Sequence, residues 1–462
     1  MYERYHIEPS PAKLSSTQMG KFEIIRKDNC LNCGQCMTHC IYDVHSRDES
    51  DPRKMAEPVS HLCKNCFSCI QNCPQQALEM VKNKKYESLG NDYWTPHKIF
   101  TIWNEAEEGK IPVYGAGFRG RFKGSGFDTI WTDMSEIVRP TRDGIHGREY
   151  IATAVDLGRK LPLISDFTKL DSPHLLEVQI PMLFDTNPLG LRLENIMLAA
   201  VRAAHQVRTY AYVNIEDYFD KLTPYLESIA FRCPLDKASH IDSVPWKKAN
   251  LIEIILPSEF SFSELGKFLN QLKKQNPNAL LSLGLSSHHL SEEILGMISS
   301  SSVDFLNLTA DSQGQSPDGE MFISESIRKL HLNLVKRHMR DEITLLGKGG
   351  IAAAEHVPKA IICGADAVIL DLSLLVATGC RVCDMCRIES CPAELKTLDP
   401  EMAAQRIINM TCAWRDQLLE ILSAMGIRDV RRLRGEKGRA MFYEEIEKES
   451  FYFIFEERPL FK

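Results

Sequence analysis

The sequence lacks any long hydrophobic run. No apolar stretch among its 462 residues approaches the roughly 20 residues that a membrane-spanning helix needs, so we expect no transmembrane segment. The first residues, MYERYHIEPSPAKLSS, also lack the apolar core of a secretory signal peptide. We therefore expect a cytoplasmic protein. Its 44% hydrophobic and 25% charged residues are typical of a globular chain and exclude wholesale disorder.

An excess of positive charge is missing as well. The 55 Lys and Arg residues are outnumbered by 62 Asp and Glu residues, which gives a formal net charge of −7. Because nucleic-acid binding depends on clustered Lys and Arg, we expect no nucleic-acid partner. No Gly-x-Gly-x-x-Gly motif follows any apolar run that predicts a strand, which argues against a dinucleotide-binding fold.

Cysteine is the informative residue that is present. Of the 15 cysteines, 12 fall into three tight clusters, and in a chain without an export signal such clusters indicate metal or redox chemistry rather than disulfides. The other three stand alone in apolar surroundings, and we expect them to be small buried hydrophobic residues. They are Cys233, Cys363 and Cys412.

Two cysteine runs near the N-terminus share the spacing C-x2-C-x2-C-x3-C. They are Cys30, Cys33, Cys36 and Cys40, then Cys63, Cys66, Cys69 and Cys73, with Pro74 after the second run. Two such runs are typical of a bacterial-type ferredoxin with two clusters, in which the fourth cysteine of each run binds the other cluster. Structural zinc takes four ligands rather than two interleaved quartets.

The spacing therefore predicts two [4Fe–4S] clusters with interleaved ligands. One is held by Cys30, Cys33, Cys36 and Cys73, and the other by Cys63, Cys66, Cys69 and Cys40.

The third cysteine cluster has a wider last gap. It consists of Cys380, Cys383, Cys386 and Cys391, followed by Pro392. We expect a separate third iron–sulfur cluster here, a [4Fe–4S] if all four thiolates bind or a [3Fe–4S] if Cys383 does not.

Eight short apolar runs from about residue 176 alternate with helical patterns, which is typical of repeated β-α units. They cover 177–185, 209–214, 228–233, 251–257, 279–286, 303–309, 343–349 and 367–373. Helical patterns lie between them at 190–205, 261–275, 323–338 and 353–363, and a long amphipathic helix is expected at about 400–425. We predict a (β/α)8 TIM barrel, an α/β fold. The third cysteine cluster begins just after the last strand, near the C-terminal mouth where barrel cofactors bind.

We divide the chain into five parts. These are a leader (1–21), the two-cluster ferredoxin domain (22–82), a connecting segment packed on the barrel (83–175), the barrel (176–378), and an iron–sulfur loop with a C-terminal helical extension (379–462). The basic segment 428–439, RDVRRLRGEKGR, is either a solvated face or a docking surface for an acidic partner.

The seventh predicted strand ends in Lys348-Gly349-Gly350-Ile351. A phosphate in a TIM barrel commonly binds at the loops after strands 7 and 8, and glycine lets backbone N–H groups approach an anion closely. This turn is therefore a candidate phosphate site.

The residues from Gly349 to Asp399, and the continuation MTCAWRDQLLEILSAMGIRDVRRLRG (410–435), resemble the FMN-binding synthase domain of glutamate synthases. The chain is most similar to the archaeal type, which carries ferredoxin clusters on the same chain. The C-x2-C-x2-C-x4-C-P motif is the most specific element of this likeness. The resemblance implies FMN in the barrel beside an iron–sulfur cluster, and reduction of 2-iminoglutarate to glutamate. The residues it implies around FMN are Lys348, Gly349, Gly350, Ile351, Asn187 and Gln313.

The chain departs from that family where the substrate would bind. The loop after strand 1, Asp185 to Gly190, keeps only the glycine of a Met-Ser-x-Gly-Ala-like motif, and the strand 5 lysine is absent from 282–287. Ala310 to Gln315 replace a Gly-Gly-Thr-Gly loop, and Asp371 stands where a glycine is expected. Tyr2 follows Met1, so no cysteine nucleophile for glutamine hydrolysis stands there.

Three functions remain open. We favour an electron-transfer subunit that relays electrons between the ferredoxin clusters, the third cluster and FMN, with a redox partner protein or ferredoxin-linked oxidoreductase subunits. The alternatives are a genuine ferredoxin-dependent glutamate synthase, using ammonia or a separate amidotransferase subunit, and an FMN-dependent reductase of another small substrate.

Overall fold

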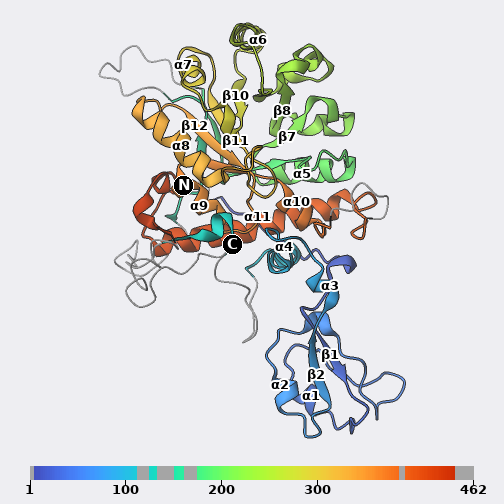
Figure 1. Ribbon diagram of the computed structural model, residues 1–462. Coiled ribbons are helices and arrows are strands. Elements are labelled where there is room, and N and C mark those ends of the chain that lie inside the picture. Colours follow the sequence, from blue (N-terminus) through green and yellow to red (C-terminus); the bar gives the residue numbers. More distant parts are fainter. Residues whose placement is uncertain (1–4, 112–123, 133–149, 161–173, 384–390, 443–462) are drawn as a thin grey trace, which may run out of the picture.

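The computed structural model describes residues 5–111, 124–132, 150–160, 174–383 and 391–442. Figure 1 shows a small N-terminal domain standing at one end of a larger barrel with surrounding helices. Within the described residues, no helix combines the length and the apolar character needed to cross a membrane.

Eight parallel strands close into the predicted barrel, in the order β6-β7-β8-β9-β10-β11-β12-β13. Their bounds are Met182–Asp185, Ala211–Asn214, Ile229–Pro234, Leu251–Ile255, Leu280–Leu285, Phe305–Thr309, Thr344–Lys348 and Ala367–Leu370. Each of the eight predicted runs overlaps one barrel strand. Most of the strand residues are buried, as expected where helices cover a parallel sheet.

Two of the predicted strands are too long. The run 177–185 is split, because Leu176–Val178 (β5) pairs antiparallel with Val155–Leu157 (β4) outside the barrel and only β6 joins it. The run 367–373 ends at Leu370, because Asp371 leaves the extended conformation (φ −121°, ψ −99°) and the short helix α10, Leu372–Ala377, follows.

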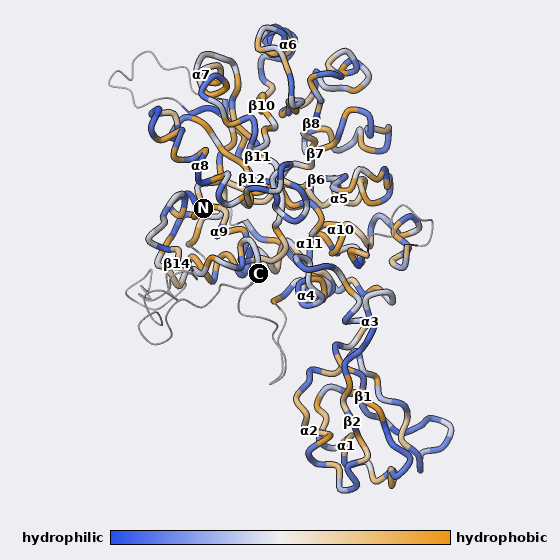
Figure 2. The backbone as a smooth tube through the Cα atoms, in the orientation of Figure 1, coloured by the Kyte–Doolittle hydropathy of each residue, from blue (hydrophilic) through white to orange (hydrophobic). Residues whose placement is uncertain are grey.

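Four helices around the barrel lie close to the predicted ranges: α5 Glu194–Gln206, α6 Phe262–Gln275, α8 Ile323–Lys336 and α9 His356–Cys363. A fifth, α7 Glu292–Ser300, had no predicted range. The connections after β7 and β8 contain 3-10 turns instead, including Asp220–Ser228 and Leu235–Ser243. Hydrophilic and hydrophobic residues alternate along outer helices such as α8, which buries Ile327, Leu330 and Leu334 against the strands (Figure 2).

A long helix, α11 (Pro400–Ala424), packs on α5 and on α4 (Pro96–Glu108). The side chain of Asp399 accepts a hydrogen bond from the Met402 N–H and caps its start. Helix α4 was not predicted within the connecting segment. Its signals are local: Thr95 caps the helix, Pro96 occupies the first turn, and Gly109 ends it with φ 68°.

The described part of the predicted leader contains one 3-10 turn, Ser15–Thr17, and is hydrogen-bonded to α11. The Asn409 side chain accepts from the Ser10 N–H at 3.0 Å and donates to the Ser10 carbonyl at 2.6 Å. The buried Arg406 donates to the carbonyls of Ala12 and Ala377. These bonds tie the segment that precedes the small domain to the barrel.

The small N-terminal domain contains two antiparallel strands, β1 (Phe22–Arg26) and β2 (Leu78–Lys82), and two one-turn helices, α1 (Gln35–Thr38) and α2 (Ser68–Gln71). Its own core is small and includes Ile24, Val44, Met55 and Leu78. The short helix α3 (Lys84–Glu87) links it to the barrel (Figure 1). One further two-stranded sheet pairs β3 (Ile130–Thr132) with β14 (Ala440–Phe442).

Candidate iron–sulfur and cofactor sites

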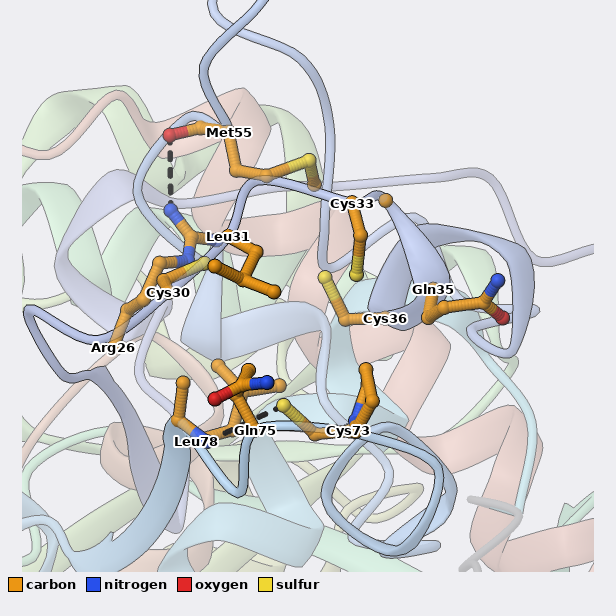
Figure 3. A pocket seen from close by; sticks show the side chains of 13 residues that line it. Arg26, Cys30, Leu31, Cys33, Gln35, Cys36, Met55, Cys73, Gln75 and Leu78 are labelled. Carbon is orange, nitrogen blue, oxygen red and sulfur yellow. Dashed lines mark hydrogen bonds between the residues drawn. The ribbon is translucent and has the colours of Figure 1, made fainter.

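The first pocket of the small domain is lined by Cys30, Cys33, Cys36 and Cys73. In Figure 3, the first three sulfur atoms face the space from one side and that of Cys73 faces it from the other. The Ala77 N–H donates to Cys73 Sγ at 3.3 Å, and Arg26 borders the cavity while donating to the Met55 carbonyl at 2.9 Å. The structure brings together the four cysteines that the spacing assigns to one cluster.

A second pocket is lined by the other quartet, Cys40, Cys63, Cys66 and Cys69. Three of these come from the second run and one from the first, so the two cavities interleave as the sequence predicts. No group of three or more His, Cys, Asp or Glu side chains in the described part of the chain is arranged to hold a single metal ion.

Each ferredoxin run opens with the same backbone turn. Asn32 (φ 52°) and Asn65 (φ 60°) adopt the left-handed conformation, and their N–H groups donate to Cys30 Sγ and Cys63 Sγ, both at 3.4 Å. Asn tolerates this conformation better than most residues. The turn aims backbone donors at the first sulfur of each run, and hydrogen bonds to cluster sulfurs are one of the factors that set a cluster's reduction potential.

Burial would keep several of these thiols protonated. It raises the pKa of Cys36 and Cys63 above the ordinary value for a thiol, and it raises the pKa of Cys69 to about 11. Coordination to a metal removes the thiol proton outright. Binding of a cationic group would therefore favour the charged form of Cys36, Cys63 and Cys69.

The third cysteine motif repeats this local geometry. The N–H of Val382, which has φ 51°, donates to the buried Cys380 Sγ at 3.4 Å. A β-branched residue in this conformation is a strained outlier that indicates a functional constraint. Cys383 and Cys391 are partly buried, whereas Cys386 lies outside the described residues. The motif begins three residues after α10, which itself follows the last barrel strand.

Charged side chains on the barrel strands β6, β8, β9 and β12 form a buried network inside the barrel. Arg232 on β8 is 5% exposed and donates to Asp185 at 2.9 Å and to Glu253 at 2.6 Å. Asn307 donates to the other oxygen of Glu253 at 2.5 Å, and Lys348 forms an ion pair with Asp185. Burial alone would raise the pKa of Asp185, but Arg232 and Lys348 hold it well below its usual range. Arg232 and Lys348 are therefore both paired with carboxylates of the barrel interior.

Arg232 and Glu253 were not among the predicted site residues. A signal was present, since each is a charged residue inside an otherwise apolar strand pattern, SIAFRC and LIEIIL. A charge at such a position is buried and must be paired.

The candidate phosphate turn lies where β12 ends. Gly349 has φ 111° and Gly350 has φ 68°, and a Cβ atom on Gly349 would lie 2.5 Å from the Asp311 carbonyl oxygen. The N–H groups of Gly350 and Ile351 donate to no described residue. Successive free N–H groups in such a turn form an anion-binding concavity.

Asn187 and Gln313, the other predicted FMN contacts, differ in their surroundings. Asn187 lies at the mouth, where its backbone N–H donates to Asp185 at 3.0 Å and its side-chain amide to Asp217 at 3.0 Å. Gln313 is exposed in the loop after β11.

Asp371, at the start of α10, is buried, and burial raises its pKa to about 7.

The three isolated cysteines are buried, as expected: Cys233, Cys363 and Cys412.

In the basic segment 428–439, Arg431 pairs with Asp429 and Asp156, and Arg434 pairs with Asp341 and Asp366. These two arginines therefore already have acidic partners within the chain.

Two family models match the chain. Residues 22–85 match a 4Fe-4S dicluster domain, and residues 258–428 match the conserved region in glutamate synthase. Curated relatives include the archaeal-type glutamate synthase [NADPH] of Dehalococcoides mccartyi, 24% identical over 90% of this chain and 94% of that protein. The archaeal glutamate synthase [NADPH] of Archaeoglobus fulgidus is 24% identical over 89% of this chain and 92% of that one. Among solved structures, the flavin-binding domain of baker's yeast flavocytochrome b2 overlaps 85% of this chain and 92% of its own, with 11% identity and a TM-score of 0.44.

The barrel and the interleaved cysteine cavities, together with the dicluster match, define an iron–sulfur protein of the oxidoreductase class. Within that class, the chain is similar to archaeal-type glutamate synthases, because both family regions and the near full-length relatives point to them. The resemblance stated from the sequence is confirmed.

Proposed function

We propose that this protein is an electron-transfer subunit of a larger redox complex. It relays electrons between two ferredoxin-type [4Fe–4S] clusters, a third iron–sulfur cluster and FMN at the barrel mouth. The observation that carries this proposal is the repetition of one sulfur-binding turn at Cys30, Cys63 and Cys380, with the last of them close to the barrel mouth. In the relay, each cluster that accepts an electron is reduced as its donor is oxidised.

The cluster ligands we assign follow the two cavities. The first cluster takes Cys30, Cys33, Cys36 and Cys73, and the second takes Cys40, Cys63, Cys66 and Cys69. For the third cluster we assign Cys380, Cys383, Cys386 and Cys391, on the strength of the Val382 turn and the motif.

The residues at the barrel mouth fit FMN. The free N–H groups of Gly350 and Ile351 would hold the phosphate, whereas Lys348 before them is already paired with Asp185. Asp371 does not exclude a phosphate, because a carboxyl with a pKa of about 7 is largely neutral just below that pH and then donates a hydrogen bond instead of repelling an anion. A bound flavin would supply the exchange between one-electron carriers and two-electron chemistry.

The second candidate is glutamate synthase itself. The near full-length match to relatives named archaeal-type glutamate synthase favours it. The mouth argues against it, since Arg232 and Lys348 are paired with carboxylates and the strand 5 position is Ser282. A dicarboxylate substrate needs cations of its own, because a buried carboxylate without a partner is costly.

The partner that follows from this proposal is a redox protein or a ferredoxin-linked oxidoreductase subunit. A separate amidotransferase subunit belongs to the second candidate only. Twelve clustered cysteines remain available as ligands in a reducing compartment, so we place the protein in the cytoplasm.

Cofactor analysis of the full chain tests the proposal. For anaerobically purified protein we expect about 12 iron atoms per chain, or about 11 if the third cluster is [3Fe–4S], with matching sulfide and one FMN. Iron near eight would contradict the third cluster. Absence of flavin after anaerobic reconstitution would contradict the FMN site.

The pH dependence of FMN binding tests the role of Asp371. Since the pKa of Asp371 is raised to about 7, the carboxyl ionises as the pH rises past that value and then repels the phosphate. We expect FMN affinity to fall about tenfold between about pH 6 and pH 8. The D371N variant should lose most of this fall. FMN's own phosphate titration affects both proteins equally, so parallel profiles from fluorescence titrations would refute the role of Asp371.

A further inference from the structure

A short turn, Gly90 to Trp94, joins the small domain to the barrel. The Asn91 side chain accepts hydrogen bonds from the N–H groups of Tyr93, at 3.0 Å, and Trp94, at 2.8 Å, while the Asn91 N–H donates to the Trp94 carbonyl at 3.0 Å. Gly90 has φ 71°, and a Cβ atom there would lie 1.7 Å from the Trp94 carbonyl oxygen. The turn is therefore tightly defined and requires glycine at its start.

This turn contacts three separate parts of the barrel mouth. The Gly90 N–H donates to the Arg381 carbonyl, inside the third cysteine motif, at 3.0 Å. Trp94 Nε1 donates to the Ser312 carbonyl in the loop after β11 at 2.8 Å, and the Tyr93 hydroxyl donates to the Gly350 carbonyl in the candidate phosphate turn. Tyr93 and Trp94 are 4% and 0% exposed. One short turn thus bonds to the cysteine motif through Gly90 and to the phosphate turn through Tyr93.

The bond to Gly350 determines where a phosphate-binding group points. In a trans peptide, the carbonyl of one residue and the N–H of the next point in opposite directions, and the described residues contain no cis peptide. By holding the Gly350 carbonyl, the Tyr93 hydroxyl directs the Ile351 N–H away from Tyr93. That N–H is one of the two that remain free for an anion.

A second set of contacts supports the same arrangement. Lys98 donates to the Tyr93 carbonyl at 3.0 Å and pairs with Asp128 at 2.8 Å. Asp128 accepts from His356 Nε2 at 2.8 Å, and His356 Nδ1 accepts from the Ala352 N–H at 3.1 Å, immediately beyond the phosphate turn. The connecting segment therefore holds the phosphate turn on both sides of Ile351.

We propose that the Gly90–Trp94 turn fixes the third cysteine motif and the phosphate turn relative to each other, with Tyr93 as a positioning residue for the FMN phosphate. This inference rests on the proposed function, because it takes FMN as the ligand of the mouth. The new element is that Tyr93, a residue outside the barrel strands, orients the backbone N–H groups that would bind the phosphate. In the sequence, Tyr93 follows shortly after α3, the helix that links the ferredoxin domain to the barrel.

The Y93F variant tests this proposal, with Y5F as a matched control. Tyr5 also donates from its hydroxyl to a distant backbone carbonyl, that of Val207 at 2.6 Å, away from the phosphate turn. In fluorescence titrations of the full chain, we expect Y93F to bind FMN about tenfold more weakly than wild type, because one buried hydrogen bond is lost. Binding of riboflavin, which has no phosphate, should be unchanged, and Y5F should match wild type with both ligands.

Hydrogen exchange adds a measurement that needs no flavin. In flavin-free protein, the Ile351 and Ala352 amides should exchange faster in Y93F than in wild type and Y5F. Equal FMN affinity and equal exchange in all three proteins would overturn this inference alone. An equal loss of FMN and riboflavin binding in Y93F would also overturn it, since that indicates general damage to the mouth. A wild type that binds no FMN would instead overturn the proposed function.

Discussion

Replacement of Arg232 by Met is expected to destabilise the barrel by about 3–5 kcal/mol at neutral pH. Arg232 lies between Asp185 and Glu253, bonds to both, and packs its guanidinium over the Tyr212 ring at 4.8 Å. The ion-paired side chains of Arg232 and Asp185 are 6% and 1% exposed, so water cannot replace the lost cation. Removing one partner leaves two buried carboxylates with Lys348 as their remaining cation in this group.

The loss should depend on pH in a defined direction. In the wild type, Arg232 and Lys348 outweigh burial and hold the pKa of Asp185 below its unfolded value, so Asp185 contributes stability above about pH 4 and loses it as the pH falls. In R232M the balance shifts toward burial, and the pKa of Asp185 rises. The variant then gains stability, relative to wild type, as the pH falls and Asp185 binds a proton. The difference between the two proteins should be largest at neutral pH and smaller near about pH 5.

Anaerobic urea unfolding of the full chain, followed by tryptophan fluorescence, provides the measurement. R202M is the control, because Arg202 pairs with Glu401 at a more exposed site, and we expect it to cost about 1 kcal/mol or less. R232K should retain part of the stability that R232M loses. If R232M and R202M unfold at the same urea concentration, the buried network does not stabilise the barrel.

Local patterns were sufficient to predict the barrel and the cysteine arrangement. Short apolar runs alternating with helical periods located all eight barrel strands, because strand and helix periodicities differ and each strand is buried. The ferredoxin spacing assigned cysteines from two runs to each cavity, since three thiolates on one loop leave the fourth free to reach the other cavity.

What could not be predicted depends on contacts between distant residues. The split after Val178 arises because β5 finds an antiparallel partner in β4, and no local pattern identifies that partner. The bonds of Tyr93 to Gly350 and of Arg406 to Ala12 join residues far apart in the chain. The Arg232 charge was visible in the sequence, but its partners Asp185 and Glu253 become neighbours only when the barrel closes.

Glutamate formation from 2-oxoglutarate, with either glutamine or ammonia, is expected to be negligible. Recognition of 2-oxoglutarate or its imine needs cations and backbone donors directed at two carboxylates. In the described mouth, Lys348 and Arg232 are both paired with Asp185, and Arg232 is paired with Glu253 as well. Ser282 stands on the strand that carries a lysine in the resembled family, and the Ala310–Gln315 loop has lost that family's glycine run. A dicarboxylate would have to break a buried ion pair to obtain a partner, which costs several kcal/mol.

The assay is glutamate production by the full chain under strictly reducing conditions, after iron, sulfide and flavin analysis has confirmed that the clusters and FMN are present. We expect the clusters to be reduced while glutamate forms at less than about one thousandth of an ordinary enzyme turnover of about 10 per second. Spectroscopic reduction of the clusters is the control, because it shows that electrons enter the protein even when no substrate reacts. Sustained turnover of about 1 per second or faster would contradict the relay and establish glutamate synthesis as the function. Lys348 or Arg232 would then have to release its carboxylate partner to bind the substrate.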